Sequence, residues 1–106
     1  MVHSNAAIFH ALGDLSRLEI VSRLAEAPAT ATDFVAPLGM TLQAVRKHLA
    51  VLEGAGVVST EKRGRVRLVR LEAGTLQEAE AWMRDRTKLW NRRLDALGRT
   101  LEEKKP

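Results

Sequence analysis

A chain of 106 residues, 45% of them hydrophobic, is enough for one domain with a core and argues against intrinsic disorder. Cysteine is absent, which excludes disulfides, thiolate metal sites and a cysteine nucleophile. The sequence has no apolar run long enough for a membrane span and no signal-peptide pattern, so we expect a cytoplasmic protein. The net charge is +4, but residues 41–70 hold seven basic and only two acidic side chains, a cluster typical either of a polyanion binder or of a solvated basic surface.

The first two elements are expected to be helices. A short helix covers about Asn5–Leu12, and Ser4 is placed to cap it. A second helix starts near residues 14–16, where Ser16 and Glu19 are spaced as a capping box. Its apolar residues then follow a helical period until a proline ends it.

Two further helices, separated by a short turn, are predicted next. The first covers about Thr32–Leu38 and ends where a proline and a glycine flank Leu38. The second has Thr41 as its N-cap and ends at the two glycines near residue 55. Its apolar residues recur at i, i+4 and i+7, which places them on one buried face: Val45, Leu49 and Leu52. The side chains left pointing elsewhere are Gln43, Arg46, Lys47 and Ala50.

A β-hairpin follows the fourth helix. Residues 57–60 and 66–71 are rich in β-branched and apolar side chains, and they flank a basic turn that contains Gly64. The alternation of apolar and polar residues is broken at Leu68 and Val69, so we expect a bulge or a twist there.

The last and longest element is a helix over about Leu76–Leu101, with an expected capping box from Thr75 to Glu78. Apolar side chains recur along it at intervals of seven residues: Leu76, Met83, Trp90 and Leu97, with Leu94 and Leu101 in a second row and Trp82 and Leu89 in a third. A helix of about 25 residues spans nearly 40 Å, more than so small a core needs. Self-association is therefore favoured over packing on its own domain.

This order of elements predicts a mainly α fold with a small β-hairpin, a winged helix-turn-helix with a long C-terminal dimerisation helix. Within a single domain covering residues 1–106, the helix-turn-helix covers about residues 30–56, the wing 57–71 and the dimerisation helix 75–101. In this fold the exposed face of one helix contacts base edges in the major groove, while the hairpin reaches the flanking backbone or minor groove. The candidate DNA contacts are Thr41, Gln43, Arg46, Lys47, His48, Arg63 and Arg65.

Several assignments keep an alternative open. His48 is interpreted either as a phosphate contact or as a packing residue of the motif. Arg67 and Arg70 are less certain than the other wing cations, because the strand can turn them away from DNA. Trp82 and Trp90 are assigned to core or dimer packing in preference to the walls of a ligand pocket.

Four segments also resemble one known family, the arsenic-repressor-type (ArsR/SmtB) transcriptional regulators. Residues 11–17, ALGDLSR, resemble the family's A-L-G-D-P-T-R opening, and residues 38–49 resemble its recognition segment. Residues 52–58 are similar to L-x-x-A-G-L-V, and residues 64–71 are similar to the wing G-R-x-x-x-Y-x-L. The resemblance covers residues 6–71 closely and the last helix in outline. Each segment alone is weak, but four in order at the right spacing are strong.

The resemblance implies a homodimeric, operator-binding regulator, usually a repressor released by an effector. Dimerisation would occur mainly through the last helix, at Leu76, Met83, Trp90, Leu94 and Leu97. Leu15 replaces the family's usual proline, and Arg46 stands where serine is commonest, so the operator cannot be borrowed from relatives.

The family's two familiar metal sites have no counterpart in the sequence. Residues 30–34 contain no cysteine and residues 75–106 no histidine, so the chain resembles a metal-independent subgroup whose effector is unknown. No cofactor is expected, and the lack of a catalytic constellation argues against an enzyme. The main alternative is a winged-helix module that binds RNA or a protein partner.

Overall fold

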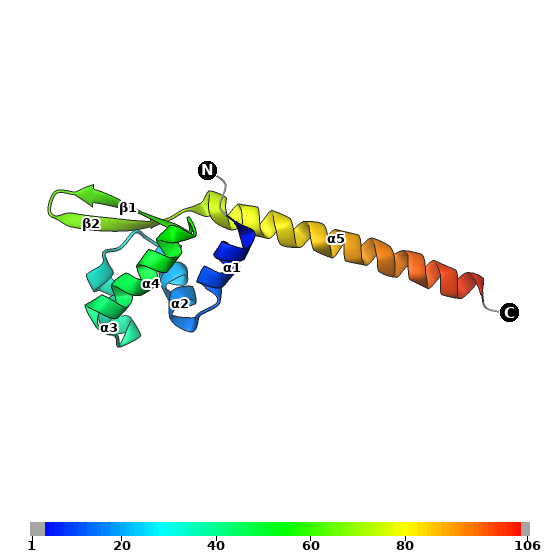
Figure 1. Cartoon of the computed structure of the whole chain (residues 1–106), viewed down its shortest axis with the longest axis horizontal. Coiled ribbons are helices and arrows are strands. Elements are labelled where there is room, and N and C mark those ends of the chain that lie inside the picture. The colour runs from blue at the N-terminus through cyan, green and yellow to red at the C-terminus, as the bar shows by residue number, and fades with distance from the viewer. Residues whose placement is uncertain (1–3, 105–106) are drawn as a thin grey trace.

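The computed structural model of the chain describes residues 4–104 and has the predicted order of helices and strands (Figure 1). The elements are α1 (Asn5–Leu12), α2 (Leu15–Leu24), the 3-10 helix η1 (Ala31–Phe34), α3 (Val35–Leu38), α4 (Leu42–Gly54), β1 (Val58–Arg63), β2 (Val66–Leu71) and α5 (Ala73–Glu103). Helices α1 to α4 pack together, the hairpin extends from one side of them, and α5 projects away from the other side (Figure 1). The predicted winged helix-turn-helix fold is confirmed.

The sequence predicted the N-terminal cap of α1 correctly but not that of α2. Ser4 caps α1 as expected, because its hydroxyl oxygen accepts a hydrogen bond from the backbone N–H of Ala7 at 3.3 Å. The predicted capping box at Ser16 is wrong. Asp14 caps α2, and its carboxylate accepts from the N–H groups of Ser16 and Arg17 at 2.9 and 3.1 Å. A carboxylate is a stronger acceptor than a hydroxyl, and it lies one residue before the helix, where its charge also complements the helix dipole.

The helix-turn-helix itself follows the prediction closely. The third helical segment is divided into η1 and α3, and it ends at Gly39, whose φ of 62° is a left-handed conformation that favours glycine. Thr41 then caps α4, with its hydroxyl oxygen accepting from the N–H of Ala44 at 3.1 Å. The turn between the helices is therefore fixed at both of its ends.

The core lies where α1, α2, α4, η1 and the base of the hairpin meet. Its largest fully buried side chains come from α1, α2, η1 and α4 and from the residue that precedes β1: Ile8, Ile20, Phe34, Val45, Leu52 and Val57. Val45 and Leu52, with the nearly buried Leu49, form the predicted apolar face of α4. This face fixes which side of α4 is left exposed.

The hairpin has a regular antiparallel register from Val58↔Leu71 to Arg63↔Val66, so the expected bulge is absent. The adjacent apolar residues of β2 instead face different surroundings. Val69 is buried and forms a bridge to Ala29, while Leu68 is half-buried on the opposite face. Two partly covered faces, rather than an irregular register, explain the broken alternation.

Helix α5 begins at Ala73, two residues before the predicted start, and the capping box at Thr75 is wrong. Thr75 is a buried residue inside the helix, and no side chain caps the helix at Glu72. The Glu72 carboxylate accepts from the Ser59 hydroxyl at 2.6 Å, and the Glu72 N–H donates to the Val57 carbonyl at 2.8 Å. These bonds fix the end of the hairpin, so that the helix starts directly after it.

Most of α5 lies outside the core. Its buried residues are Thr75 and Ala79, and every residue from position 80 to 104 is exposed. Trp82 of α5 packs against α1 through an edge-to-face contact with Phe9, with 5.6 Å between the ring centroids. Beyond it the helix extends alone and gives the molecule a longest dimension of 74 Å. No helix in the described part of the chain is long and apolar enough to span a membrane.

Candidate nucleic-acid interface

The exposed face of α4 carries the predicted contacts. Burial of Val45, Leu49 and Leu52 leaves Gln43, Arg46 and Lys47 exposed on the opposite side of the helix. Within the described residues, neither Arg46 nor Lys47 has a carboxylate oxygen within 4.0 Å. This face therefore presents an amide and two unpaired cations, the groups that hydrogen-bond to base edges and phosphates.

The hairpin tip presents a second set of cations. Gly64 and Arg65 form a two-residue turn between the paired Arg63 and Val66, and Gly64 has a φ of 63° that this turn requires. Arg63 lies 3.5 Å from the carboxylate of Glu61, whereas Arg65 has no such partner in the described part of the chain. The tip is thus cationic and held in a single tight turn.

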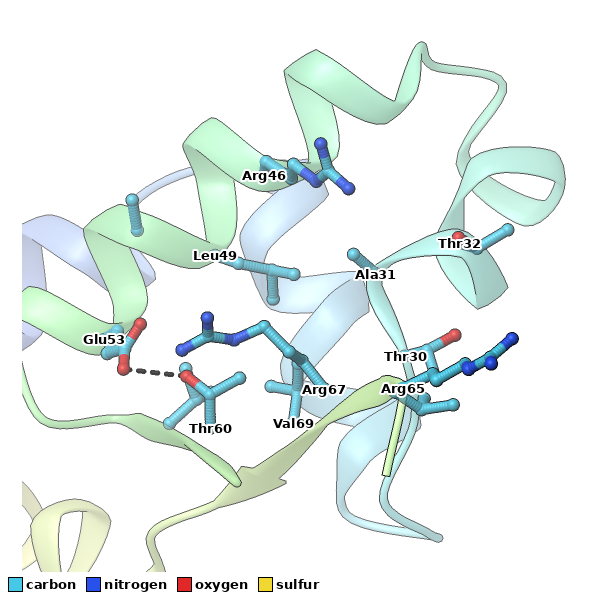
Figure 2. Close-up of a pocket in the computed structure, with 13 residues that line it drawn as sticks. Thr30, Ala31, Thr32, Arg46, Leu49, Glu53, Thr60, Arg65, Arg67 and Val69 are labelled. Carbon is cyan, nitrogen blue, oxygen red and sulfur yellow. Dashed lines mark hydrogen bonds between the residues drawn. The ribbon is translucent and has the colours of Figure 1, made fainter. Parts of the chain in front are cut away.

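A groove separates α4 from the hairpin (Figure 2). It has a volume of about 870 Å³, and we call it the helix–hairpin groove. Arg46 from α4 and Arg67 from β2 project into it, and Leu49 and Val69 lie on its floor. Glu53 of α4 and Thr60 of β1 join its two sides, because the Thr60 hydroxyl donates to the Glu53 carboxylate at 2.8 Å.

The sequence left Arg67 and Arg70 less certain than the other wing cations, and the structure places them on opposite faces of β2. Residues of a strand point alternately to its two faces, so Arg67 faces the groove with Val69, and Arg70 lies on the other face. Arg70 is 3.7 Å from Glu61, on the face away from the groove. The alternation itself could have signalled this difference, had the register of the hairpin been known.

His48 lies away from the exposed face, at the contact between α2 and α4. Its Nδ1 atom is 3.2 Å from Nη1 of Arg17 and 4.0 Å from the carboxylate of Asp14. A guanidinium only donates, so Nδ1 of His48 is the acceptor in the contact with Arg17. This position favours the packing interpretation of His48 over the phosphate contact.

Arg17 is the residue whose importance the sequence did not indicate. Besides its bond to His48, its Nε donates to the Ala11 carbonyl at 2.6 Å and its Nη2 to the His10 carbonyl at 3.3 Å. It thereby joins the end of α1, the start of α2 and the middle of α4. The Arg17 backbone N–H is the main cause that lowers the pKa of Asp14; the guanidinium charge, the Ser16 N–H and His48 add to it, and desolvation opposes it.

The predicted dimer-interface residues lie along one face of α5. Leu76 is half-buried against the core, and Met83, Trp90, Leu94 and Leu97 are exposed by 45–62%. From Met83 onward these residues, together with Thr87 and Leu101, follow an alternating spacing of four and three residues, which is that of a coiled-coil seam. In residues 4–104 no three metal-ligating side chains gather into a group that could hold an ion.

The sequence matches a helix-turn-helix domain family and a transcriptional regulator. A family model described as a helix-turn-helix domain matches residues 12–61. A relative from Bacillus subtilis, the uncharacterized HTH-type transcriptional regulator YuzN, is 39% identical over 70 residues, which cover 59% of this chain and 76% of the relative.

Solved structures give the same result over a larger part of the chain. A crystal structure of an ArsR family transcriptional regulator has 36% identity and a TM-score of 0.75, covering 81% of this chain and 89% of its own. An ArsR-like regulator from Rhodococcus sp. RHA1 has 31% identity and a TM-score of 0.83, covering 91% of each chain. The same fold is shared by a Mycobacterium bovis domain, which is described as a homodimeric winged helix-turn-helix DNA-binding domain. It has 20% identity and a TM-score of 0.64, covering 78% of each chain.

Proposed function

The chain belongs to the ArsR family of winged helix-turn-helix transcriptional regulators, and we propose that it acts as a homodimeric repressor on an inverted-repeat operator. The observation that carries this proposal is the surface shared by α4 and the hairpin. Gln43, Arg46 and Lys47 are exposed on one, and Arg63 and Arg65 on the other. Such a surface fits a helix in the major groove with a cationic hairpin beside it on the flanking backbone.

The contacts divide into two kinds. Gln43 and Arg46 have the side chains that pair with two atoms of adenine and guanine, so they are the proposed base contacts. Lys47 and the hairpin cations are proposed phosphate contacts, which position the protein without selecting sequence. Thr41 is at the N-terminus of α4, where backbone N–H groups and its own hydroxyl are available to a phosphate.

Dimerisation is proposed to occur through α5. The seam from Met83 to Leu101 is exposed along its length, and none of residues 4–104 buries it. The homodimeric relative from Mycobacterium bovis supports the same assembly. A twofold dimer presents two copies of α4 about 34 Å apart, so the operator should be an inverted repeat with half-sites about 10 base pairs apart.

Metal ions are not expected to control DNA binding. The positions that hold cysteines in the metal sensors of the family are occupied by residues 30–34, and α5 has no histidine. We therefore propose that the chain belongs to a metal-independent subgroup, in which an effector of another chemical class, or none, releases the DNA.

Selection of DNA from a pool of randomised duplexes tests the function. We expect an enriched inverted repeat, bound with a slope of log affinity against log salt of about −5 to −7 if six to eight phosphates are contacted. Arg46→Ala should weaken binding of the enriched site, whereas Arg92→Ala, which removes an equal charge from the exposed part of α5, should not. Enrichment of no duplex, or equal binding of single-stranded RNA, would instead favour an interaction module.

A further inference from the structure

The helix–hairpin groove has cations on opposite sides and an apolar floor. Arg46 belongs to α4 and Arg67 to β2, so the two guanidinium groups enter the groove from different elements (Figure 2). Leu49 and Val69 beneath them are 8% and 3% exposed. In the described part of the chain, neither arginine has a carboxylate oxygen within 4.0 Å, so both charges are available to a ligand.

The groove also contains one carboxylate with a defined role. Glu53 accepts the hydroxyl hydrogen of Thr60 at 2.8 Å, and this bond holds β1 against the C-terminal half of α4. The width of the groove is therefore set by a contact between the two elements that form it. A partner in the groove must bring hydrogen-bond acceptors to Arg46 and Arg67, and it must pass beside the bond between Glu53 and Thr60.

The geometry of B-form DNA indicates what that partner is. A major groove and the adjacent minor groove are separated by one sugar–phosphate strand. If α4 occupies the former and the hairpin tip approaches the latter, that strand has to pass between them. Its phosphates match the guanidinium group of Arg67, and its deoxyribose carbons match the apolar side chains on the groove floor.

We propose that the helix–hairpin groove holds one sugar–phosphate strand of the bound duplex, with Arg67 against its phosphates. This rests on the proposed function, and it adds a phosphate contact that the sequence left less certain. A small anionic molecule would meet the same cations. DNA is the better match because the groove lies directly between the exposed face of α4 and the hairpin tip.

The matched pair of variants is Arg67→Ala and Arg70→Ala. Both remove one arginine from the same strand, but Arg70 lies on the other face, 3.7 Å from Glu61. Because a dimer loses two phosphate contacts, Arg67→Ala should flatten the salt slope by about 1.8 and lower affinity about tenfold at low salt. Arg70→Ala should change affinity less than about twofold. Thermal unfolding of each variant identifies any loss that comes from misfolding, and Arg67→Lys should restore part of the slope.

Duplexes in which one phosphate is replaced by a neutral methylphosphonate identify the phosphate that Arg67 contacts. With the wild-type dimer, neutralising one backbone position in each half-site, between the bases that α4 contacts and the flanking minor groove, should lower affinity. With Arg67→Ala the same substitution should cost little more.

Equal effects of Arg67→Ala and Arg70→Ala, or a methylphosphonate penalty that is unchanged in Arg67→Ala, would overturn the groove proposal while leaving DNA binding intact. Failure of the wild-type protein to bind any duplex would overturn both proposals.

Discussion

Removal of Arg17 should be among the most damaging single changes outside the apolar core. Its guanidinium donates to the carbonyls of Ala11 and His10 and to Nδ1 of His48, at 2.6, 3.3 and 3.2 Å. A hydrogen bond to a charged group contributes about 1.5–3 kcal/mol, and the partial exposure of this site places the estimate at the lower end for each bond. With the 3.3 Å bond discounted, we expect Arg17→Ala to lower the free energy of unfolding by about 3 kcal/mol.

Urea unfolding of wild type and variant at one fixed protein concentration measures this loss of stability. A double-mutant cycle with His48→Ala isolates the bond between the two side chains, for which we expect a coupling of about 1 kcal/mol. Arg23→Ala is the matched control, because it removes an exposed ion pair to Glu19 on the same helix and should cost less than about 0.5 kcal/mol. Equal losses for Arg17→Ala and Arg23→Ala, or a coupling of zero, would refute the view that Arg17 joins the three helices.

Four further predictions concern the operator, the dimer, metals and pH. Gln43→Ala and Arg46→Ala should each cost about 1–3 kcal/mol at the selected operator and relax the preference at one base pair, as measured by competition between single-base variants. Leu94→Asp should convert the dimer to a monomer in light scattering at micromolar concentration, whereas Lys88→Asp on the other side of α5 should not; two dimeric variants would exclude the proposed seam. Zinc, cadmium and arsenite should leave operator affinity unchanged, and a stoichiometric metal ion with a tenfold loss of affinity would reveal a site that the sequence does not indicate. The pKa of Asp14 is lowered in the folded state. The ionised carboxylate therefore stabilises the fold above the unfolded pKa of 3.8, and this contribution is lost as the pH falls below that value. The difference in stability between wild type and Asp14→Asn should shrink below about pH 4 and stay constant from pH 5 to 7.

The sequence predicted those features that one helix or one turn determines by itself. Val45, Leu49 and Leu52 define the buried face of α4 through their spacing alone, and Thr41 and Gly39 mark the turn before it. The residues of α4 that do not belong to this buried face form its exposed face. For this reason Gln43, Arg46 and Lys47 could be assigned to one surface without any knowledge of tertiary packing.

Features that depend on a contact between elements could not be predicted in the same way. Ser16 and Thr75 both begin sequences that fit a capping box, but Asp14 and the bonds of Glu72 to the hairpin set the true helix starts. Likewise, the role of Arg67 depends on the register of β2, and that of Arg17 on three helices that meet only in the folded chain. Local propensity offers two or more solutions at such positions, and tertiary contacts select among them.

The exposed part of α5 gives a physical reason to expect a partner. Most helical stability in proteins comes from packing of an amphipathic face, and residues 80–103 have little of their own domain to pack against. Five seam side chains, Met83, Trp90, Leu94, Leu97 and Leu101, are each about half exposed, so burying the remainder contributes about 1 kcal/mol per side chain and about 10 kcal/mol per dimer. Association itself costs about 4–15 kcal/mol, a range that brackets this gain. The seam alone therefore supports a dimer of limited affinity, in which the loss of a single leucine from both chains, about 2 kcal/mol, changes the dissociation constant by more than tenfold. In the proposed dimer two copies of α4 bind one operator together, so operator occupancy should depend steeply on protein concentration near that constant.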